Sequence, residues 1–307
     1  MQASLSREKT HDFRMMRLDE VGFESSDELA GMYKLSPYVW QENGRFELLL
    51  RVVNYSDNPS EKVARIHHGS SIDGLHFSLD ETPVIPPGPD LPGSYDSGGC
   101  EDPTLARVDG EYYVYYTGWN EHLKRGELLL ATGSDIHHLE KRGVAFESSE
   151  QARNPKEATI VQAPDGSWRL FFEYAHESKS KIGLARSAHV SGPWQVLPPL
   201  FEARAESWDS WHLSTGPILN SNPNFPVMFY NGATERLMWR VGWVVFNADY
   251  TQVAARSQHP IIFPHIKRNA DDTDIAFAAS SIEVDGAIHL YYSVADQYVT
   301  RAIIRRV

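Results

Sequence analysis

Short segments in which hydrophobic and polar residues alternate run along the whole chain, and turns that contain Gly or Asn separate them. The turns ENGR at 42–45, DGE at 109–111, DGS at 165–167 and DGA at 285–287 carry the residues that tight hairpins need for a positive φ angle. No helical periodicity competes with this pattern. The sequence therefore predicts an all-β protein built from hairpins.

The hairpins belong to a longer repeat, in which a strand, a tight turn and a second strand rich in Tyr, Phe or Leu are followed by a third strand. The copies begin about 50 to 65 residues apart, a period typical of repeat architectures. Their strand–turn–strand segments cover residues 38–55, 101–120, 157–176, 212–233 and 274–296. Five such repeats predict a five-bladed β-propeller. A β-sandwich, the alternative, lacks a period of this length.

The fifth copy stops after its third strand, where the chain ends. The segment DFRMMRLDEVGF at 12–23 is suited to supply the missing outer strand. We therefore expect residues 1–307 to form a single propeller domain whose N-terminal strand closes the last blade. A Pro/Gly-rich stretch at 82–99 links the first two blades, and it is expected to form a loop over one face because it cannot continue a strand.

Composition narrows the classes of partner. The chain has 307 residues and a formal net charge of −12, which disfavours nucleic acid because phosphate contacts need a basic face. Its single cysteine excludes an intramolecular disulfide. The N-terminus has no apolar leader segment, and no run approaches the roughly 18 apolar residues of a membrane span. We expect a cytoplasmic protein with no membrane partner, while the presence of a homo-oligomer stays open.

Carboxylates recur where the innermost strand of each blade begins. The first copy has Ser36 at this place, and the later copies have Glu101 and Asp102, Glu157, Asp209, and Asp274. The starts of innermost strands meet at the mouth of a propeller's channel, so these acids are expected to converge on one pocket. Like charges that are brought together shift their pKa values apart, which is how two carboxyls become an acid and a base. The alternative is that each acid caps a strand or stays solvated in a loop.

Two arginines are expected on the second strands of the repeats. Arg51 ends the segment LLLR, and Arg240 lies in MWRVGW. Each places a charge on a strand that faces other strands, and Arg is rarely buried without a partner. They are expected either to hold carboxylates in place or to bind hydroxyl groups of a ligand.

Other chemistries lack their motifs in this chain. It has no phosphate-binding Gly-rich loop, no HExxH, no Cys pair for zinc and no G-x-S-x-G turn. The segments IHHG at 66–69 and DIHH at 135–138 contain adjacent histidines, but neighbours on a strand face opposite ways. We therefore expect no metal site there and no cofactor. Binding of Ca²⁺ or Mg²⁺ at the carboxylates stays open, because hard cations take oxygen ligands.

The segment GGCEDPTLARVDGEYYVYYTGWN at 98–120 resembles the GxEDPR…YYxxYT signature of glycoside hydrolase family 130, the mannoside phosphorylases and mannosidases. Further segments resemble other motifs of this family in the same order, among them STGPIL, FPVMFYNGA, MWRVGWVVFNAD and HLYYSVADQYVTRA. The resemblance extends over roughly residues 30–306. It implies a five-bladed propeller, in agreement with the number of repeats.

The resemblance also implies roles for single residues. Asp102, in the EDP motif, corresponds to the catalytic acid of the family, and Asp296 corresponds to a sugar-binding aspartate. Arg51 and Arg240 correspond to arginines of the substrate pocket. Glu157 takes the place of an aspartate that lines the site.

Three departures from the family pattern bear on the attacking group. Asn231 stands where the phosphorylases carry a His that helps to hold phosphate, Thr104 replaces an Arg, and Ser36 replaces an Asn of the sugar pocket. The loss of positive donors weakens a phosphate site, because phosphate is held by charge-assisted hydrogen bonds. We therefore expect water to attack. Basic residues near this region that could compensate are Lys156, Arg153 and Arg142.

The expected function is that of an inverting glycoside hydrolase acting on β-mannosides or closely related oligosaccharides. Asp102 would protonate the leaving oxygen, and Glu157, or in second place Asp209, would activate water from about 6.5–9.5 Å away. The alternatives are a mannoside phosphorylase and a propeller that binds carbohydrate without turnover. Further residues expected to contact the sugar are Tyr116, Trp119, Trp211 and His212.

Overall fold

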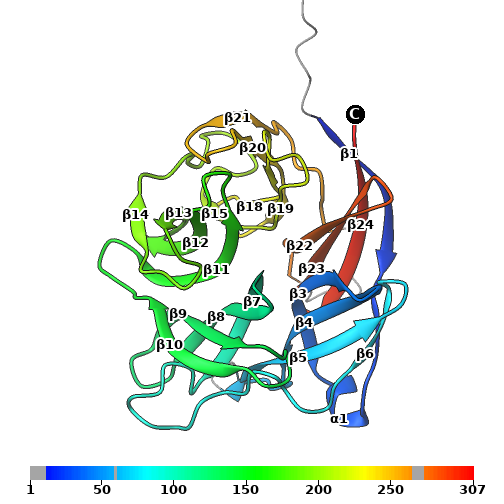
Figure 1. Cartoon of the computed structure of the whole chain (residues 1–307), viewed down its shortest axis with the longest axis vertical. Coiled ribbons are helices and arrows are strands. Elements are labelled where there is room, and N and C mark those ends of the chain that lie inside the picture. The colour runs from blue at the N-terminus through cyan, green and yellow to red at the C-terminus, as the bar shows by residue number, and fades with distance from the viewer. Residues whose placement is uncertain (1–11, 59–60, 265–272) are drawn as a thin grey trace, which may run out of the picture.

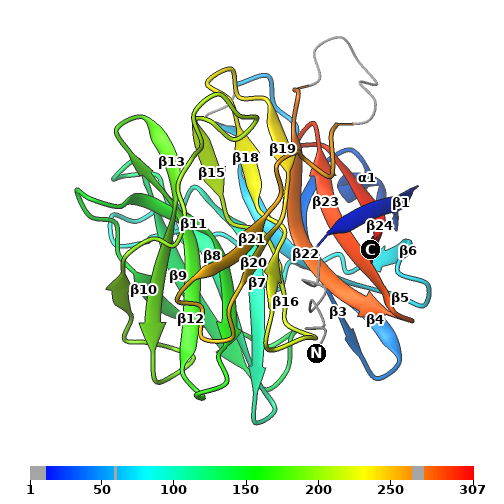
Figure 2. The ribbon, with the colours of Figure 1, turned by 90° about the horizontal axis from the view of Figure 1, so that it is seen from above.

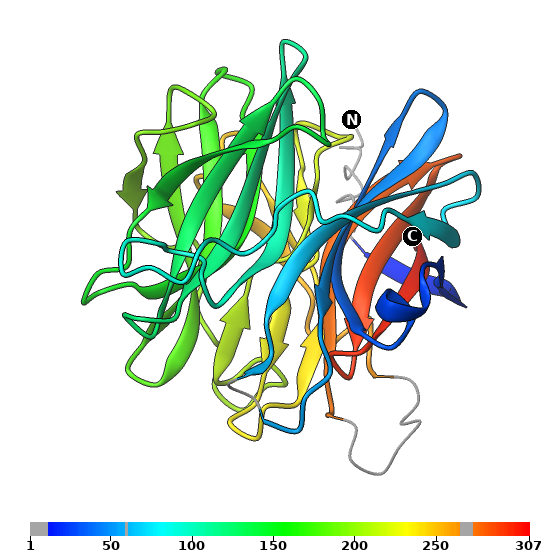
Figure 3. The ribbon, with the colours of Figure 1, turned by 90° about the horizontal axis from the view of Figure 1, so that it is seen from below.

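The structure is a computed structural model that describes residues 12–58, 61–264 and 273–307. Nearly all of its regular structure is strand, which confirms an all-β fold. The helix α1 (Asp27–Ala30) has four residues and lies at the outer edge of the molecule (Figures 1 and 3). Within the described ranges, no helix has the length and hydrophobicity needed to cross a membrane. The expectation about an apolar leader falls mainly on residues 1–11, outside the described residues.

Each of the first three sequence repeats folds into four antiparallel strands. The first repeat forms β3 (Tyr33–Glu42), β4 (Arg45–Val53), β5 (Ala64–Ser71) and β6 (His76–Leu79). The second repeat forms β7 (Gly99–Val108), β8 (Glu111–Asn120), β9 (Arg125–Gly133) and β10 (Glu140–Phe146). The third repeat forms β11 (Arg153–Gln162), β12 (Trp168–His176), β13 (Lys179–Ser187) and β14 (Gln195–Leu197).

The fourth repeat forms two short sheets. Its strands are β15 (His212–Ser214), β16 (Ile218–Leu219), β17 (Val227–Met228), β18 (Asn231–Ala233), β19 (Trp239–Val241), β20 (Val244–Phe246) and β21 (Val253–Arg256). One sheet has the strand order β15–β18–β19 and the other has the order β16–β17–β20–β21. The fifth repeat forms β22 (Ala276–Val284), β23 (Ala287–Val294) and β24 (Tyr298–Arg306).

The N-terminal segment supplies a fourth strand to the fifth repeat. Strand β1 (Phe13–Glu20) pairs antiparallel with β24, and Phe13 lies opposite Arg306. Figure 2 shows these strands side by side at one edge of the molecule. The chain then continues through β2 (Gly22–Glu24), which runs parallel to β6 of the first repeat. The two ends of the chain therefore share one sheet.

The sheets lie around a common centre (Figure 1). The innermost strands contact one another in the order β3, β7, β11, β16 and β22, and β22 contacts β3 again. Between the first two repeats, β5 and β7 also pair in parallel at Ala64 and Gly99. The stretch at 82–98 is a loop apart from an isolated bridge between Ile85 and Ile66. The starts of the innermost strands are thus brought to one region.

The hydrophobic core consists of layers between neighbouring sheets. The second strand of each repeat is buried on both faces, which explains its uninterrupted apolar run, because neighbouring side chains on a strand point to opposite faces. Leu48 packs toward the fifth repeat and Leu49 toward the second. Pairs that share a layer are Leu48 with Tyr291, Leu49 with Tyr116, Leu130 with Phe172, Phe171 with Phe246, and Phe229 with Leu290.

Candidate active site

The inner strands of the first three repeats are interrupted at the same place. In β3, β7 and β11 the pairing register shifts around Ser36, Asp102 and Glu157, whose φ angles are 48°, 50° and 49°. A β-bulge bends its strand and re-aims a side chain. A left-handed backbone costs a non-glycine residue roughly 1–3 kcal/mol, so it persists only where surrounding contacts hold it. The three bulges fall at the same position of the repeat. At this position the chain adopts a backbone conformation that lowers stability and re-orients a side chain.

Hydrogen bonds from neighbouring repeats hold these bulges. The backbone N–H of Ser36 donates to the hydroxyl oxygen of Ser293 at 2.8 Å. The hydroxyl of Thr215 donates to the carbonyl oxygen of Glu157. The hydroxyl of Ser36 donates to Oδ1 of Asp102 at 2.7 Å. Because each bond joins two repeats, the position of each bulge depends on how the sheets pack.

A cavity of about 420 Å³ opens beside the bulges. Asp102 is 4% exposed and contacts the cavity through Ser36, which lines it. The polar lining consists of Ser36, Arg51, Lys62, Lys156, Glu157, Glu173, Thr273, Ser293, Asp296 and Gln297. The apolar lining consists of Tyr33, Leu35, Val53, Trp239, Ile275, Phe277 and Ala295. Apolar walls with a few convergent charged groups are typical of a ligand site.

Arg51 connects the carboxylates of the first two repeats. Its Nη2 lies 2.6 Å from Oε1 of Glu101, and its Nη1 donates to Oδ1 of Asp102 at 3.1 Å. Burial lowers the pKa of Arg51, but the nearby carboxylates, Glu101 and Asp102 first and then Glu157 and Asp296, raise it further, and the net shift is upward. The guanidinium therefore stays charged and orients Asp102, as expected of a pairing arginine.

The carboxyl of Glu157 has the most perturbed environment of the candidate acids. Burial raises its pKa well above the usual range, and the negative charge of Asp102 raises it further, while Lys156 and Arg51 act in the opposite direction. Burial also raises the pKa of Glu101, with Arg51 opposing. A carboxyl of this kind holds its proton at a pH where ordinary carboxyls have lost it, so the cavity contains an acid next to charged groups.

Lys156 and Glu173 form a second pair on the cavity wall. Nζ of Lys156 lies 3.5 Å from Oε1 of Glu173, which is 3% exposed. Glu173 raises the pKa of Lys156 more than burial lowers it. The sequence analysis missed Glu173, although a carboxylate that ends the apolar run LFFE gives the same signal as Arg51 in LLLR. Arg153 and Arg142, also expected near this region, line separate hollows.

Asp209 does not lie in the cavity. Its fully buried carboxylate accepts hydrogen bonds from Arg204, Arg256 and the Tyr230 hydroxyl, with Oδ2 at 2.9 Å, 2.5 Å and 2.7 Å from the donors. Burial raises the pKa of Asp209, but the hydrogen bonds from Arg204 and Tyr230 lower it more. The expected role as a base for water is therefore corrected: the carboxylate is an enclosed ion-pair partner with no access to a substrate.

Asn231 and Tyr116 are also enclosed in the protein, contrary to their expected contact with substrate. The amide nitrogen of Asn231 donates to the carbonyl oxygens of Thr215 and Ala278 at 2.6 Å and 3.1 Å, and its amide oxygen accepts from Ala278 N at 2.7 Å. Tyr116 is fully buried, and its hydroxyl donates to Oδ2 of Asp96 at 3.0 Å. Both polar groups are satisfied by the protein itself.

The remaining candidates differ in how they relate to the cavity. Trp119 and Glu101 line an adjoining cavity that shares Arg51 with the first. The ring of His212 stacks on Trp239 of the cavity wall, with centroids 5.7 Å apart. Nζ of Lys179 lies 4.0 Å from the ring centroid of Trp211. Arg240 pairs with Asp274 at 3.0 Å, next to the lining residues Trp239 and Thr273. Asp296 lines the cavity directly, with a φ angle of 55°.

The chain matches a known enzyme family over nearly its whole length. The family model for glycoside hydrolase family 130, described as β-1,4-mannooligosaccharide phosphorylase, matches residues 16–306. The chain belongs to family 130. It is 24% identical to a 1,2-β-oligomannan phosphorylase of Thermoanaerobacter sp. (strain X514) over 271 residues, which are 86% of this chain and 86% of that protein.

Solved structures of the family share the fold. A β-1,2-mannobiose phosphorylase from Listeria innocua, in complex with β-1,2-mannobiose, superposes with a TM-score of 0.76 at 21% identity over 94% of this chain and 96% of its own. A second structure was described with family 130 hydrolases that target β-1,2-mannosidic linkages in Candida mannan. It has a TM-score of 0.75 at 21% identity and covers 97% of this chain and 95% of its own.

These comparisons confirm the family predicted from the EDP segment. They favour the alternative function over the expected one, because the similar curated proteins are named phosphorylases. Hydrolases of the family are named with one of the similar solved structures, but at 21% identity that structure shows the fold alone.

Proposed function

We propose that the five repeats form one closed five-bladed β-propeller, a single catalytic domain whose last blade is completed by β1. Two observations support it. The innermost strands contact one another from β3 round to β22 and back to β3. The pairing of β1 with β24 joins the two ends of the chain within one sheet. The likeness to solved family 130 structures agrees with this arrangement.

We propose that the enzyme transfers a mannosyl group from a β-mannoside to inorganic phosphate. The observation that carries this proposal is that Lys156 and Glu157, a carboxyl whose pKa is raised by burial, line the same cavity. A neutral carboxyl is a poor base for water, and it does not repel an anion as a carboxylate would. Lys156 and Lys62 supply charge-assisted donors for phosphate in the same cavity.

In this mechanism the protonated form of Asp102 donates its proton to the leaving glycosidic oxygen, directly or through a hydroxyl of the substrate, and the carboxylate takes up a proton from solvent before the next turnover. A phosphate oxygen attacks the anomeric carbon from the opposite face, so the glycosidic C–O bond breaks while a new C–O bond to phosphate forms with inversion. Ser36 and Arg51 orient Asp102 through their hydrogen bonds. The rings of Trp239 and Phe277 offer apolar surface to the sugar. The products are a sugar 1-phosphate and a shortened mannoside.

Hydrolysis is the second candidate, and one observation favours it. Glu157 and Glu173 bring two carboxyls to the wall beside Lys156, and Asn231 offers no free donor to phosphate because its amide bonds to backbone groups. In that case Glu157 would lose its proton and activate a water molecule. The two candidates thus differ in the protonation state of a single carboxyl.

The deciding experiment incubates the enzyme with β-1,2- and β-1,4-linked mannobiose in phosphate buffer and in phosphate-free buffer. Phosphorolysis gives mannose 1-phosphate only when phosphate is present, and the reverse reaction of mannose 1-phosphate with mannose releases phosphate. Free mannose at equal rates in both buffers would overturn the proposal in favour of hydrolysis. Binding of sugar with neither product would indicate a non-catalytic carbohydrate-binding protein.

A lysine variant tests where phosphate binds. Lys156→Gln removes a charged donor, a loss of about 1.5–3 kcal/mol, so we expect the KM for phosphate to rise roughly 10- to 150-fold at about 1.4 kcal/mol per tenfold. Lys181→Gln, whose lysine pairs with Glu202 at 3.9 Å and does not line the cavity, is the matched control. An unchanged phosphate KM in Lys156→Gln would remove Lys156 from the phosphate site.

A further inference from the structure

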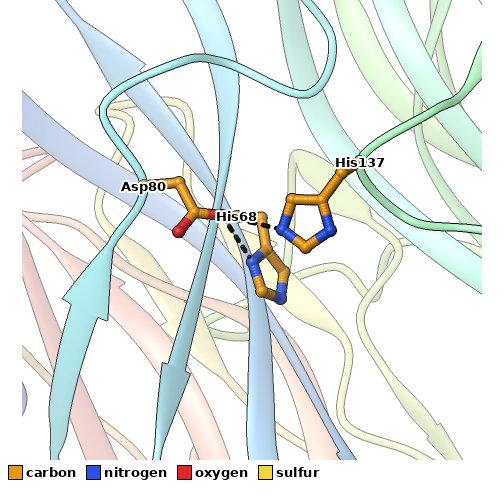
Figure 4. Close-up of side chains that lie close together, drawn as sticks. All are labelled: His68, Asp80 and His137. Atoms are coloured by element: carbon orange, nitrogen blue, oxygen red, sulfur yellow. Dashed lines mark hydrogen bonds and ion pairs between the residues drawn. The ribbon is translucent and has the colours of Figure 1, made fainter.

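The two histidine segments found in the sequence meet in space. His68, on β5, and His137, on the loop after β9, both face the carboxylate of Asp80, which directly follows β6 (Figure 4). Nδ1 of His68 lies 2.8 Å from Oδ2 of Asp80, and Nε2 of His137 lies 3.0 Å from the same oxygen. One histidine from each segment therefore reaches the same carboxylate.

The outer nitrogens of both rings also face carboxylates. Nε2 of His68 lies 3.0 Å from Oε2 of Glu47, and Nδ1 of His137 lies 3.3 Å from Oδ1 of Asp135. A neutral imidazole carries one N–H, and it donates this hydrogen to one neighbour only. When the N–H groups point at Glu47 and Asp135, the lone pairs of the two inner nitrogens face the Asp80 carboxylate. Three acceptor atoms then converge within 4.8 Å of one another.

We propose that this cluster binds a divalent transition-metal ion, Zn²⁺ by preference, through His68 Nδ1, His137 Nε2 and the carboxylate of Asp80. Two imidazoles and a carboxylate are a donor set that zinc accepts, with water in the fourth position. A ligating histidine that donates its other N–H to a carboxylate is the usual outer arrangement of such sites. Here each histidine has such a carboxylate, Glu47 for His68 and Asp135 for His137.

The three ligand atoms lie within 4.8 Å of one another, and an ion would draw them to a tetrahedral spacing. Tetrahedral bonds of about 2.0–2.1 Å place ligand atoms roughly 3.3–3.4 Å apart, so the inner nitrogens move away from the Asp80 oxygen by a few tenths of an ångström. His68 is buried beside Trp40, with ring centroids 6.2 Å apart. The side chain of His137 is 49% exposed, which leaves a path from solvent to the site.

The site joins two repeats at a weakly paired boundary. His68 and Asp80 belong to the first repeat and His137 to the second, while the strands of these repeats pair only at Ala64 and Gly99 within the described residues. None of the three ligands lines the candidate active-site cavity. The metal therefore serves as a brace between the first two sheets and takes no part in the reaction.

The test is a titration of the full-length, chelator-treated protein with Zn²⁺ alone, followed by calorimetry and by metal analysis after dialysis. We expect one equivalent of zinc to bind and the thermal midpoint to rise as zinc is added. His137→Ala should lose the bound equivalent and the rise in midpoint while retaining its turnover of mannoside. Glu47→Gln, which keeps all three ligands, should weaken zinc binding about 10- to 100-fold.

His76→Ala is the matched control, because His76 is an exposed histidine that pairs with Asp73 at 2.7 Å outside the cluster. Its zinc binding should equal that of the unmodified protein. Absence of saturable binding by the unmodified protein would reduce the cluster to ion pairs and overturn the proposal. Equal zinc affinity in His137→Ala and the unmodified protein would overturn it as well, since the ion would then be held elsewhere.

Discussion

The substitution Glu157→Gln separates the two ways in which the cavity could act. A protonated Glu157 can donate a hydrogen bond to a phosphate oxygen, and Gln retains the size of the side chain and one donor. Exchanging one neutral donor for another changes binding by about 1 kcal/mol or less, so phosphorolysis should survive within about tenfold at 1.4 kcal/mol per tenfold. If Glu157 is instead the base that activates water, its loss should cost about 10²–10⁴ in rate.

The same substitution also tests how the stability of the folded protein depends on pH. Burial and Asp102 raise the pKa of Glu157 in the folded protein above its unfolded value of 4.5. Above pH 4.5 the folded state therefore keeps a proton that the unfolded state has lost, so the stability of the unmodified protein falls as pH rises toward the folded pKa. In this window the free energy of unfolding of the unmodified protein falls, relative to that of Glu157→Gln, by up to about 1.4 kcal/mol per pH unit.

Two measurements check this reasoning. The first is the rate of sugar 1-phosphate formation by Glu157→Gln at saturating phosphate, and the second is the thermal midpoint of both proteins between pH 4 and 8. Glu206→Gln, an exposed acid outside the cavity, controls for the loss of one charge. A hundredfold drop in phosphorolysis, or a midpoint that depends on pH equally in both proteins, would refute the argument that Glu157 is protonated and binds phosphate.

Two further substitutions test the acid and the buried ion pair. Asp102→Asn should fold normally by circular dichroism and lose about 10²–10⁴ in turnover of an unactivated mannobiose, the range for a general acid; an unchanged rate would remove Asp102 from this role. Asp209→Asn should leave the rate per folded molecule unchanged but cost about 3–5 kcal/mol, because Arg204 and Arg256 lose a buried partner. At about 2.1 cal/mol/K per residue over 307 residues, this lowers the thermal midpoint by roughly 5–8 °C, and a rate loss without this shift would restore a catalytic role for Asp209.

The sheets could be predicted because local chemistry determines them. A positive φ angle is required in the turns at Asn43 and Gly44, at Asp109 and at Asp285, and the chain places Gly, Asn or Asp there. The period of the repeat then gives the number of repeats, although the fourth repeat forms two short sheets in place of one. The N-terminal strand was predictable for a related reason, since the fifth sheet lacks an outer strand and β1 pairs with β24.

Part of the candidate site could be predicted from a position shared by all five repeats. Each second strand has three apolar residues followed by a polar one, and these polar residues are Arg51, Thr117, Glu173, Asn231 and Ser293. Arg51, Glu173 and Ser293 line the cavity. The pattern would have found Glu173 and Ser293, because a polar side chain at the end of a strand buried on both faces needs a partner or a cavity.

The errors arose where a residue type fits two environments. Asp209 precedes the first strand of its repeat, as Asp274 does, but Arg204 and Arg256 pair with it, and no local sequence pattern indicates these pairs. Asn231 occupies the same repeat position as Arg51, yet the break between β15 and β16 leaves backbone groups at Thr215 that its amide satisfies. Such partners are set by packing between sheets, and hydrophobic periodicity does not report on that packing.

In the proposed mechanism, charge balance links the binding of sugar to the binding of phosphate. Arg51 and Lys156 are already paired with carboxylates, so a phosphate dianion gains their attraction only if the negative charge around them falls. Burial reduces this negative charge, because desolvation disfavours a charged carboxyl, and burial already raises the pKa of Glu157. In that mechanism a sugar ring in the cavity would exclude more water and raise the pKa of Glu157 further. We infer that bound substrate, by raising the pKa of Glu157, favours the binding of phosphate. The deprotonated Glu157 that could activate water is then rarest while the glycosidic bond is intact.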